Sequence, residues 1–314
     1  MTTRFNTGGR NYGYGKQIGF AVKNALKDRY GEGKYATRAA HEARFANFNQ
    51  HLKEEGIKDL KKIDQNTIER YGHKLNMAIS RNDMSVAYAQ NLLSTVNVVM
   101  SQVREDKTLH VSPATVVGQR SHIRTTAPKS IDRTLVTQAL AKIETPESKV
   151  TVQLAREFGL RFKETALLNL NRAIKEASAT GQFNVIEGTK GGRVAERLIS
   201  VSSKQLTVLK EAKAVAGRFK NIVGKTGSFK QWQNRFAAEY RQSGAQALLG
   251  KFHDLRAAYA CERYHELTGT PAPVIAGQRT AAYGLDQHAR ATVAFELGHH
   301  RLGVGSSYLG SASQ

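Results

Sequence analysis

The chain has 314 residues, and its 47 Lys and Arg against 26 Asp and Glu give a formal net charge of +21. A chain this basic most often binds a polyanion, with nucleic acid the leading candidate, although a basic surface that aids solubility or binds anionic membranes has the same composition. Cys261, as the single cysteine, excludes an intramolecular disulfide framework and a multi-cysteine zinc site. No apolar run approaches the roughly 18–20 residues that a membrane span needs, so a cytoplasmic location is expected.

The length predicts two domains, each large enough to bury a core of its own. Residues 1–130 hold 21 basic and 11 acidic side chains, so the positive charge is shared between the two halves. An isolated basic tail is excluded, and both domains are expected to contact the polyanion.

The first half reads as a small all-α module. The glycine-rich residues 1–15 predict a flexible start, and residues 16–106 then show apolar positions at helical spacing. Asp64 and Asp83 are suitable N-caps for the third and fourth helices. The predicted helices cover 16–29, 36–55, 66–80 and 83–104.

Residues 107–131 break this periodicity and form the predicted linker. The segment contains two prolines and no acidic residue. A basic connector between two basic domains suits a strap along a phosphate backbone, although a solvated linker has the same composition. The candidate DNA contacts in it are Lys107, Arg120, Arg124 and Lys129.

Residues 132–314 predict a second, mostly α domain. A β-hairpin with a glycine-rich turn at 188–192 is expected between residues 182 and 201. The fold class is therefore mainly α, with a small β-hairpin in the second domain. The helices predicted there cover 132–143, 147–158, 203–217, 229–242, 251–268 and 286–297.

Several residues suited to phosphate chemistry follow one another in this domain. Arginine pairs with phosphate in bidentate geometry, and a tyrosine can act as a covalent nucleophile. The His-x-x-Arg motif begins a predicted helix, whose N-terminus favours phosphate. Nine residues separate the histidine of Leu-Gly-His from a late tyrosine. In chain order the candidates are Arg161 with Glu164, Lys190, His253, Arg256, His299 and Tyr308.

This order resembles the tyrosine recombinase (phage integrase) family over about residues 130–314. The resemblance implies that Arg161 and Arg256 clamp the scissile phosphate and that Glu164 supports this region. It implies that His253 accepts the proton of the nucleophile and that His299 donates a hydrogen bond to a nonbridging oxygen. Tyr308 would be the nucleophile.

For the leaving 5′ oxygen, the resemblance implies a hairpin lysine as the proton donor. Lys190 matches by position and turn glycines, but a turn lysine is commonly only solvated, and Lys163 is the reserve candidate. Of the adjacent His299 and His300, only one can point inward, and the motif selects His299. No carboxylate or cysteine cluster accompanies the pair, so no metal and no cofactor is expected.

The resemblance implies a site-specific recombinase, an integrase of a mobile element, that acts on duplex DNA as a homotetramer on paired sites. It implies a monomer or dimer when free, a prokaryotic, nucleoid-associated protein, and accessory DNA-bending or directionality proteins. Two alternatives stay open: a type IB topoisomerase-like enzyme that relaxes DNA, and a DNA-binding protein without catalysis. The chain ends six residues after Tyr308, whereas the resemblance implies a further helix that docks on a neighbouring subunit, so either protomers couple in another way or this is a shortened form.

Overall fold

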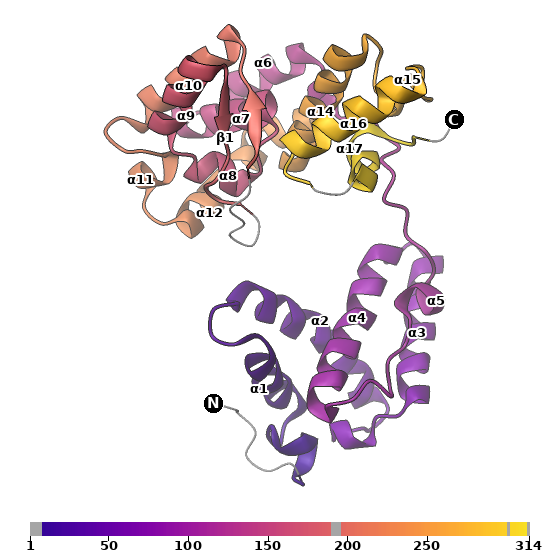
Figure 1. Ribbon diagram of the computed structural model, residues 1–314. Helices are drawn as coiled ribbons and strands as arrows, with labels where there is room; N and C mark the ends of the chain where they lie inside the picture. Colours follow the sequence, from indigo (N-terminus) through magenta and orange to yellow (C-terminus); the bar gives the residue numbers. More distant parts are fainter. Residues whose placement is uncertain (1–7, 190–195, 300–301, 313–314) are drawn as a thin grey trace. The chain divides into compact units, whose positions relative to one another are not determined.

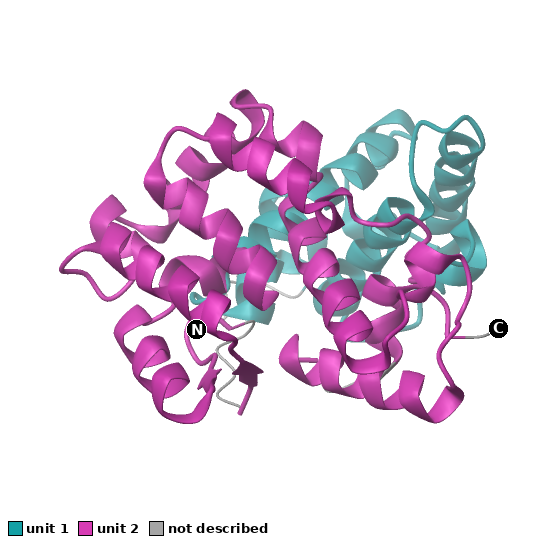
Figure 2. Cartoon of the chain, turned by 90° about the horizontal axis from the view of Figure 1, so that it is seen from above, with its two compact units in different colours: residues 1–121 teal, residues 122–314 magenta. Residues whose placement is uncertain are grey.

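Helices make up most of the computed structural model, which describes residues 8–189, 196–299 and 302–312. All ten predicted helices are present, and each end lies within three residues of its predicted position. The mainly α fold class with one small antiparallel pair of strands is thus confirmed. The chain divides into two compact units, residues 1–121 and 122–314 (Figure 2).

The first unit is a bundle in which α4 packs against α1, α2 and α3. Its core contains Leu26, Phe48, Leu93 and Val96, none more than 1% exposed. The Asp64 side chain caps α3 as predicted, by accepting a hydrogen bond from the amide of Thr67. The elements are η1 (Arg10–Gly13), α1 (Ile18–Tyr30), α2 (Tyr35–Glu54), η2 (Leu60–Lys62), α3 (Gln65–Ser80), α4 (Val86–Arg104) and α5 (Pro113–Val117).

The cap predicted for α4 is wrong by two residues. Ser85 is the N-cap, because its side chain accepts a hydrogen bond from the amide of Tyr88. Asp83 belongs to the preceding turn, where its amide donates to the carbonyl of Ala78. The helix therefore begins at Val86 and not at residue 83.

Within residues 1–15, which the sequence predicts to be flexible, residues 8–15 are described and include η1. Asn11 is fully buried there. Its side-chain oxygen accepts from the amide of Leu60, and its own amide donates to Asp59 Oδ1, both at 2.8 Å. These two hydrogen bonds hold η1 against η2, which a pattern based on local composition does not detect.

The unit boundary lies inside the predicted linker, residues 107–131. Val111 and Val117 are buried in the first unit, and Nδ2 of the Asn97 side chain donates to the carbonyl of Val111 at 2.7 Å. Ser130, by contrast, is buried in the second unit and donates to the carbonyl of Asp254. The segment is thus shared between the units, while its role as a DNA strap stays a prediction.

The second unit has two adjoining cores. In the first, α7 and α10 pack together, and the rings of Phe158 and Phe183 pack edge to face with their centroids 5.3 Å apart. In the second, α14 packs against α16 and α17 (Figure 1). Helix α14 also contacts α7, and its small residues Ala257, Ala258 and Ala260 are fully buried, which allows close packing on both sides.

The elements of the second unit place the candidate residues around α14. The strands β1 and β2 pair antiparallel, with Phe183 opposite Ile199. Helices α8 and α9 and six short helices of the described residues are additional to the predicted ones. In chain order the elements are η3 (Lys129–Ile131), α6 (Arg133–Lys142), α7 (Pro146–Phe158), α8 (Phe162–Leu167), α9 (Leu170–Thr180), β1 (Gln182–Asn184), β2 (Leu198–Ser200), α10 (Ser203–Ala216), α11 (Ile222–Thr226), α12 (Phe229–Gln242), α13 (Ala245–Leu249), α14 (Phe252–Thr268), α15 (Pro273–Ala276), α16 (Tyr283–Glu296), η5 (Leu302–Gly305) and α17 (Ser306–Leu309).

Candidate active site

Arg256 lies at the centre of the site, on the second turn of α14, and is only 1% exposed. Its Nη1 and Nη2 donate to the carbonyls of Gly159 and Leu297, which end α7 and follow α16. Its Nε donates to Tyr308 Oη at 3.2 Å, and Nη2 lies 3.3 Å from His299 Nε2. One buried guanidinium thus joins four segments of the second unit.

Arg161 reaches the same place from the N-terminus of α8. Its Nη2 donates to the carbonyl of Leu297 at 3.2 Å, so Arg161 and Arg256 share one acceptor. The approach requires Gly159, which ends α7 with φ +60°, because a Cβ there would lie 2.4 Å from Tyr259 Cδ1. The sequence phrase around Arg161 therefore encodes a tight turn between α7 and α8.

Glu164 is the carboxylate that these arginines surround, and it is fully buried. Its Oε1 lies 2.6 Å from Arg161 Nη1 and 2.8 Å from Arg197 Nη1, and its Oε2 lies 3.9 Å from Arg256 Nη1. Burial acts to raise the pKa of Glu164, but Arg197, Arg161 and Arg256 outweigh it and the pKa is lowered. The predicted supporting residue is therefore an ionised hub of the cluster.

Tyr308 and His299 complete the arrangement from the C-terminal part of the chain. His299 Nε2 lies 3.1 Å from Tyr308 Oη, and Tyr308, on the short helix α17, is only 3% exposed. The phenol thus lies between an arginine and an imidazole. These contacts bring together two residues that the sequence pairs only by a nine-residue spacing.

His253 lies at the edge of the site and remains exposed to water. Its ring centroid is 5.3 Å from that of Tyr308, with the planes tilted by 45°. The partial loss of water at this contact, followed by the charge of Arg256, lowers the pKa of His253. The imidazole is therefore neutral near pH 7 and able to accept a proton.

The positive charges of the cluster act on its other members as well. Burial lowers the pKa of Arg256 to about 10, and Arg197 and Arg161 act in the same direction. Burial, followed by Arg256 and Arg161, lowers the pKa of His299 to about 4. At neutral pH the arginines are therefore charged while His299 is neutral, with one ring N–H still available as a donor.

The hairpin lysine, Lys190, lies outside the described residues. The described part of the connection approaches α8: a Cβ on Gly188, whose φ is +71°, would lie 2.5 Å from the carbonyl oxygen of Lys163. The side chain of Lys163 has its Nζ 5.9 Å from the centroid of the Phe229 ring. His300, the histidine that the motif did not select, also lies outside the described residues.

The four candidate DNA contacts differ in their surroundings. Lys107 and Arg120 are exposed in the first unit. Arg124 forms an ion pair with Asp254 at 2.7 Å, and its amide donates to the carbonyl of Ser306 at 2.9 Å. Lys129 donates to the carbonyl of Ala247 at 3.2 Å. Arg124 is thus held beside the residues that precede Tyr308.

Two residues of the site, Arg197 and Glu296, were not predicted from the sequence. Arg197, which binds Glu164, is a lone arginine after the turn glycines and belongs to no motif. Its alternation with the inward-facing Ile199 and Val201 is the signal that could have placed it on the core side of the strand. The second group is Glu296, whose carboxylate accepts from Tyr259 at 2.8 Å and from Arg263 at 3.0 Å, and whose pKa burial raises.

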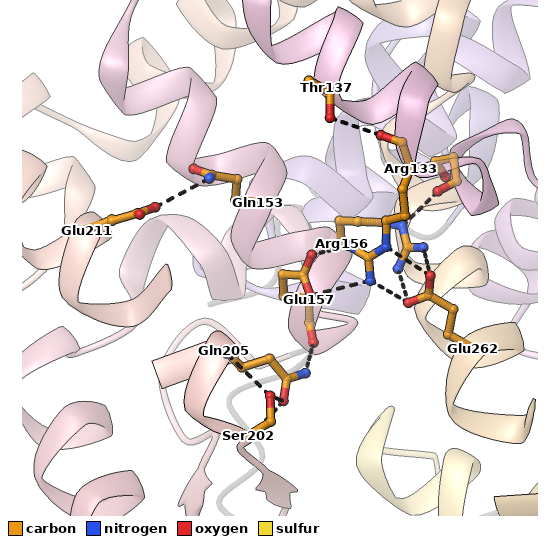
Figure 3. Close-up of polar contacts among 10 residues, drawn as sticks. Arg133, Thr137, Gln153, Arg156, Glu157, Ser202, Gln205, Glu211 and Glu262 are labelled. Carbon is orange, nitrogen blue, oxygen red and sulfur yellow. Dashed lines mark hydrogen bonds and ion pairs between the residues drawn. The ribbon is translucent and has the colours of Figure 1, made fainter. Parts of the chain in front are cut away.

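A second polar cluster lies in the same unit, between α6, α7 and α14 (Figure 3). Arg133 bridges Glu157 and Glu262, while the fully buried Arg156 binds Glu262 and donates through Nε to the carbonyl of Ser130 at 2.7 Å. Arg133, Glu157 and Glu262 border a cavity of about 480 Å³. Because its charges pair with one another, this cluster holds three helices together and is structural.

Within residues 8–189, 196–299 and 302–312, no three His, Cys, Asp or Glu side chains gather in a way that could hold a metal ion. No helix there has both the length and the apolar character of a membrane span. Cys261 is buried in α14, where burial raises the pKa of its thiol to about 12.

A protein-family model described as "Integrase" matches residues 118–262. A solved structure of a lambda integrase dimer bound to a COC′ core site is similar with a TM-score of 0.57 and 18% identity, covering 90% of this chain and 94% of that chain. A Tn1549 transposon integrase in complex with circular intermediate DNA is similar with a TM-score of 0.56 and 10% identity, covering 92% and 95%. At these identities the structural likeness is one of fold.

No curated protein sequence matches the chain. The family match nevertheless covers Arg161, the hairpin and Arg256, and the fold is shared over nine-tenths of the chain. Residues 118–262 are thus similar to the integrase family, and this match together with the shared fold supports a tyrosine recombinase.

Proposed function

We propose that Tyr308 is the nucleophile of this recombinase and attacks the scissile phosphodiester of duplex DNA. The phenol oxygen would bond to phosphorus, giving a 3′-phosphotyrosyl link, while the bond to the 5′ oxygen breaks. The observation that carries the proposal is the position of Tyr308 Oη, 3.2 Å from Arg256 Nε and 3.1 Å from His299 Nε2. A nearby guanidinium stabilises a developing phenolate, which lowers the cost of the attack.

Arg161 and Arg256 form the proposed clamp on the phosphate. Both donate to the carbonyl of Leu297, so the two guanidinium groups converge on one point beside Tyr308. Preorganised charge stabilises the added negative charge of a pentacoordinate transition state without reorganisation at the moment of reaction. Neutral His299 would donate its N–H to a nonbridging oxygen.

Proton transfer is assigned to His253 and Lys190. His253, whose pKa is lowered and whose ring centroid lies 5.3 Å from that of Tyr308, would accept the phenol proton once it comes within hydrogen-bond distance of Tyr308 Oη. Lys190 would protonate the departing 5′ oxygen, with Lys163 as the reserve. The phosphotyrosyl bond conserves the energy of the phosphodiester, so a different 5′-hydroxyl can reseal it, and no metal or cofactor takes part.

Duplex DNA is the proposed partner of both units. The similar lambda integrase was solved as a dimer on a core site, and the Tn1549 integrase with circular intermediate DNA. We extend this to four protomers on two paired sites, with accessory DNA-bending or directionality proteins. The domains proposed are residues 16–106 for DNA binding and 132–314 for catalysis, acting together in the cytoplasm of a prokaryotic cell.

Replacement of the nucleophile tests the central assignment. A DNA substrate with a nick beside the scissile phosphate should trap the wild-type protein covalently. Tyr308→Phe should bind the same DNA with unchanged affinity and form no covalent adduct, because it lacks the phenol oxygen that attacks phosphorus. The measurement is the covalent complex resolved on a denaturing gel.

Tyr283→Phe is the matched control, because Tyr283 is 67% exposed on the surface of the same unit. It should form the adduct as the wild type does. An adduct formed by Tyr308→Phe would move the nucleophile to another residue. Relaxation of supercoiled DNA by a monomer without a paired site would favour a type IB topoisomerase, and DNA binding without cleavage would favour a protein that has lost catalysis.

A further inference from the structure

Arg197 is fixed by its backbone at the base of the hairpin formed by β1 and β2. Its amide donates to Asn184 Oδ1 at 2.9 Å, and its carbonyl accepts from the amide of Val185 at 3.1 Å. Arg197 also stands two residues after the undescribed segment 190–195, which contains Lys190. The position of its backbone is therefore tied to the position of the hairpin.

The side chain of Arg197 extends from this base into the arginine cluster. Its Nη1 lies 2.8 Å from Glu164 Oε1, and its Nε donates to the carbonyl of Glu296 at 2.7 Å. Gly298 leaves room for it, since a Cβ there would lie 3.0 Å from Arg197 Cδ. The guanidinium is 4% exposed and bridges the carboxylate of α8 with the end of α16.

Two features distinguish Arg197 from an arginine that serves only folding. Its Nη2 is buried and has no hydrogen-bond partner among the described residues, which costs stability. In addition, Arg161, Arg197 and Arg256 meet the single carboxylate of Glu164, which leaves a net charge of +2 on a cluster in which Arg197 and Arg256 are buried and Arg161 is half-buried. A surplus of buried positive charge is unfavourable without an anion, and a phosphodiester supplies one.

We propose that Arg197 is a positioning residue that couples the hairpin to the arginine cluster through Glu164 and the carbonyl of Glu296. The proposal rests on the proposed function, in which the hairpin carries the proton donor Lys190. By fixing the base of the hairpin to the residue that holds Arg161, Arg197 keeps the proton donor in register with the clamped phosphate. Loss of Arg197 then affects protonation of the leaving oxygen more than charge stabilisation on phosphorus.

Cleavage of two substrates separates these effects. Protonation matters for an ordinary 5′ oxygen but little for a 5′-bridging phosphorothiolate, because sulfur leaves as a stabilised thiolate. Arg197→Met keeps the length of the side chain and removes its bonds, and Arg197→Lys keeps the charge and secures a folded variant. We expect Arg197→Met to slow single-turnover cleavage of ordinary DNA about 100-fold and to lose most of this defect on the phosphorothiolate. Arg197→Lys should show the same selectivity with a smaller defect.

Arg156→Met is the matched control for the loss of a buried arginine. Like Arg197, Arg156 binds one glutamate and donates through Nε to a backbone carbonyl, but it belongs to the cluster of Figure 3. It should lower the thermal midpoint of unfolding and leave the ratio of the two cleavage rates at its wild-type value. If Arg197→Met and Arg197→Lys keep that wild-type ratio, whether by slowing both substrates equally or neither, the coupling is overturned.

The variant Lys190→Ala distinguishes the two proposals. If its slow cleavage of ordinary DNA is restored on the phosphorothiolate, Lys190 is the proton donor. If cleavage stays slow on the phosphorothiolate, the assignment of Lys190 as the proton donor fails. The coupling by Arg197 is judged only by the substrate selectivity of the Arg197 variants, relative to Arg156→Met. A selective defect in Arg197→Met together with a nonselective one in Lys190→Ala would keep the coupling and direct the search for the donor to Lys163.

Discussion

At the scale of single residues, the site is governed by an imbalance of charge. Three guanidinium groups surround Glu164, and the pKa of each neighbouring imidazole is lowered, first by burial and then by these charges. A buried group of this kind costs folding energy until an anion binds. The free protein is therefore expected to keep His299 neutral, so that the arginines retain their preference for a phosphate.

This arrangement predicts how His299 contributes to stability as the pH changes. In the unfolded chain a histidine takes up a proton near pH 6.5, whereas in the folded protein His299 does so only near pH 4. The unfolded state binds more protons between these values, so stability is lost as the pH falls through this window and is fully present above pH 6.5. The contribution should be about 1 to 2 kcal/mol between pH 7 and pH 5, because the ring is partly screened by water.

The measurement is the free energy of unfolding in urea at pH 7 and pH 5, for the wild type and for His299→Asn. The wild type should lose more stability than the variant over this interval. The exposed His288 on α16 provides a control, since His288→Asn removes a histidine without touching the site. Equal losses in wild type and His299→Asn would show that this imidazole titrates at its ordinary pKa.

At the scale of elements, the sequence predicted what is periodic and missed what depends on distant contacts. Long amphipathic helices such as α4 and α12 were located well, because their apolar spacing continues over several turns. Helices α8 and α9 were not predicted. Helix α8 has only six residues, too few to show a period, whereas α9 has eleven and was missed although it is longer than the predicted α6. The contacts of Arg161 at the start of α8 and of Arg256 on the second turn of α14 were not predicted either, because their common partner, the carbonyl of Leu297, lies far away in the chain.

The site residues divide in the same way. Spacing and motif identified Arg161, His253, Arg256, His299 and Tyr308, all of which the structure brings together. Arg197 could not be found by a motif, because its place in the site comes from an ion pair with Glu164, 33 positions earlier in the chain. The sequence also gave no sign that Arg124 is paired with Asp254.

The segment around Arg124 joins two elements of the site. Its ion pair reaches the first turn of α14, beside His253, and its amide holds the carbonyl of Ser306 on α17, which carries Tyr308. We expect Arg124→Ala to slow cleavage at saturating DNA about tenfold, because a small displacement of the nucleophile is costly. The measurement is single-turnover cleavage, together with DNA affinity as a function of salt.

Arg120→Ala is the matched variant for this test. Arg120 is exposed, and as a contact to phosphate its loss should weaken DNA binding uniformly and reduce the salt slope by about 1, with unchanged cleavage at saturation. If Arg124→Ala instead weakens DNA binding and leaves cleavage at saturation unchanged, the guanidinium of wild-type Arg124 leaves Asp254 for a phosphate when DNA binds, as expected for a basic strap.

At the scale of the whole molecule, two units with separate cores are proposed to bind one polyanionic partner. Each has its own buried cluster, and the positive charge is distributed over both. Two linked binding units gain affinity from effective concentration, and that gain falls as the connection lengthens. Each unit meanwhile displaces counterions from the phosphates that it contacts, which sets the dependence on salt.

These two properties respond differently to a longer connection. A flexible insert of about ten Gly and Ser residues between Ser121 and His122 should lower affinity for the site several-fold, because the second unit binds at a lower effective concentration. The slope of log affinity against log salt should stay at its wild-type value, since the same phosphates are neutralised. The same insert between Gly217 and Arg218, in a surface turn of the second unit, should leave both unchanged. A shallower slope with the insert at Ser121 would mean that one unit has left the DNA, and an unchanged affinity would mean that a single unit supplies all of the binding.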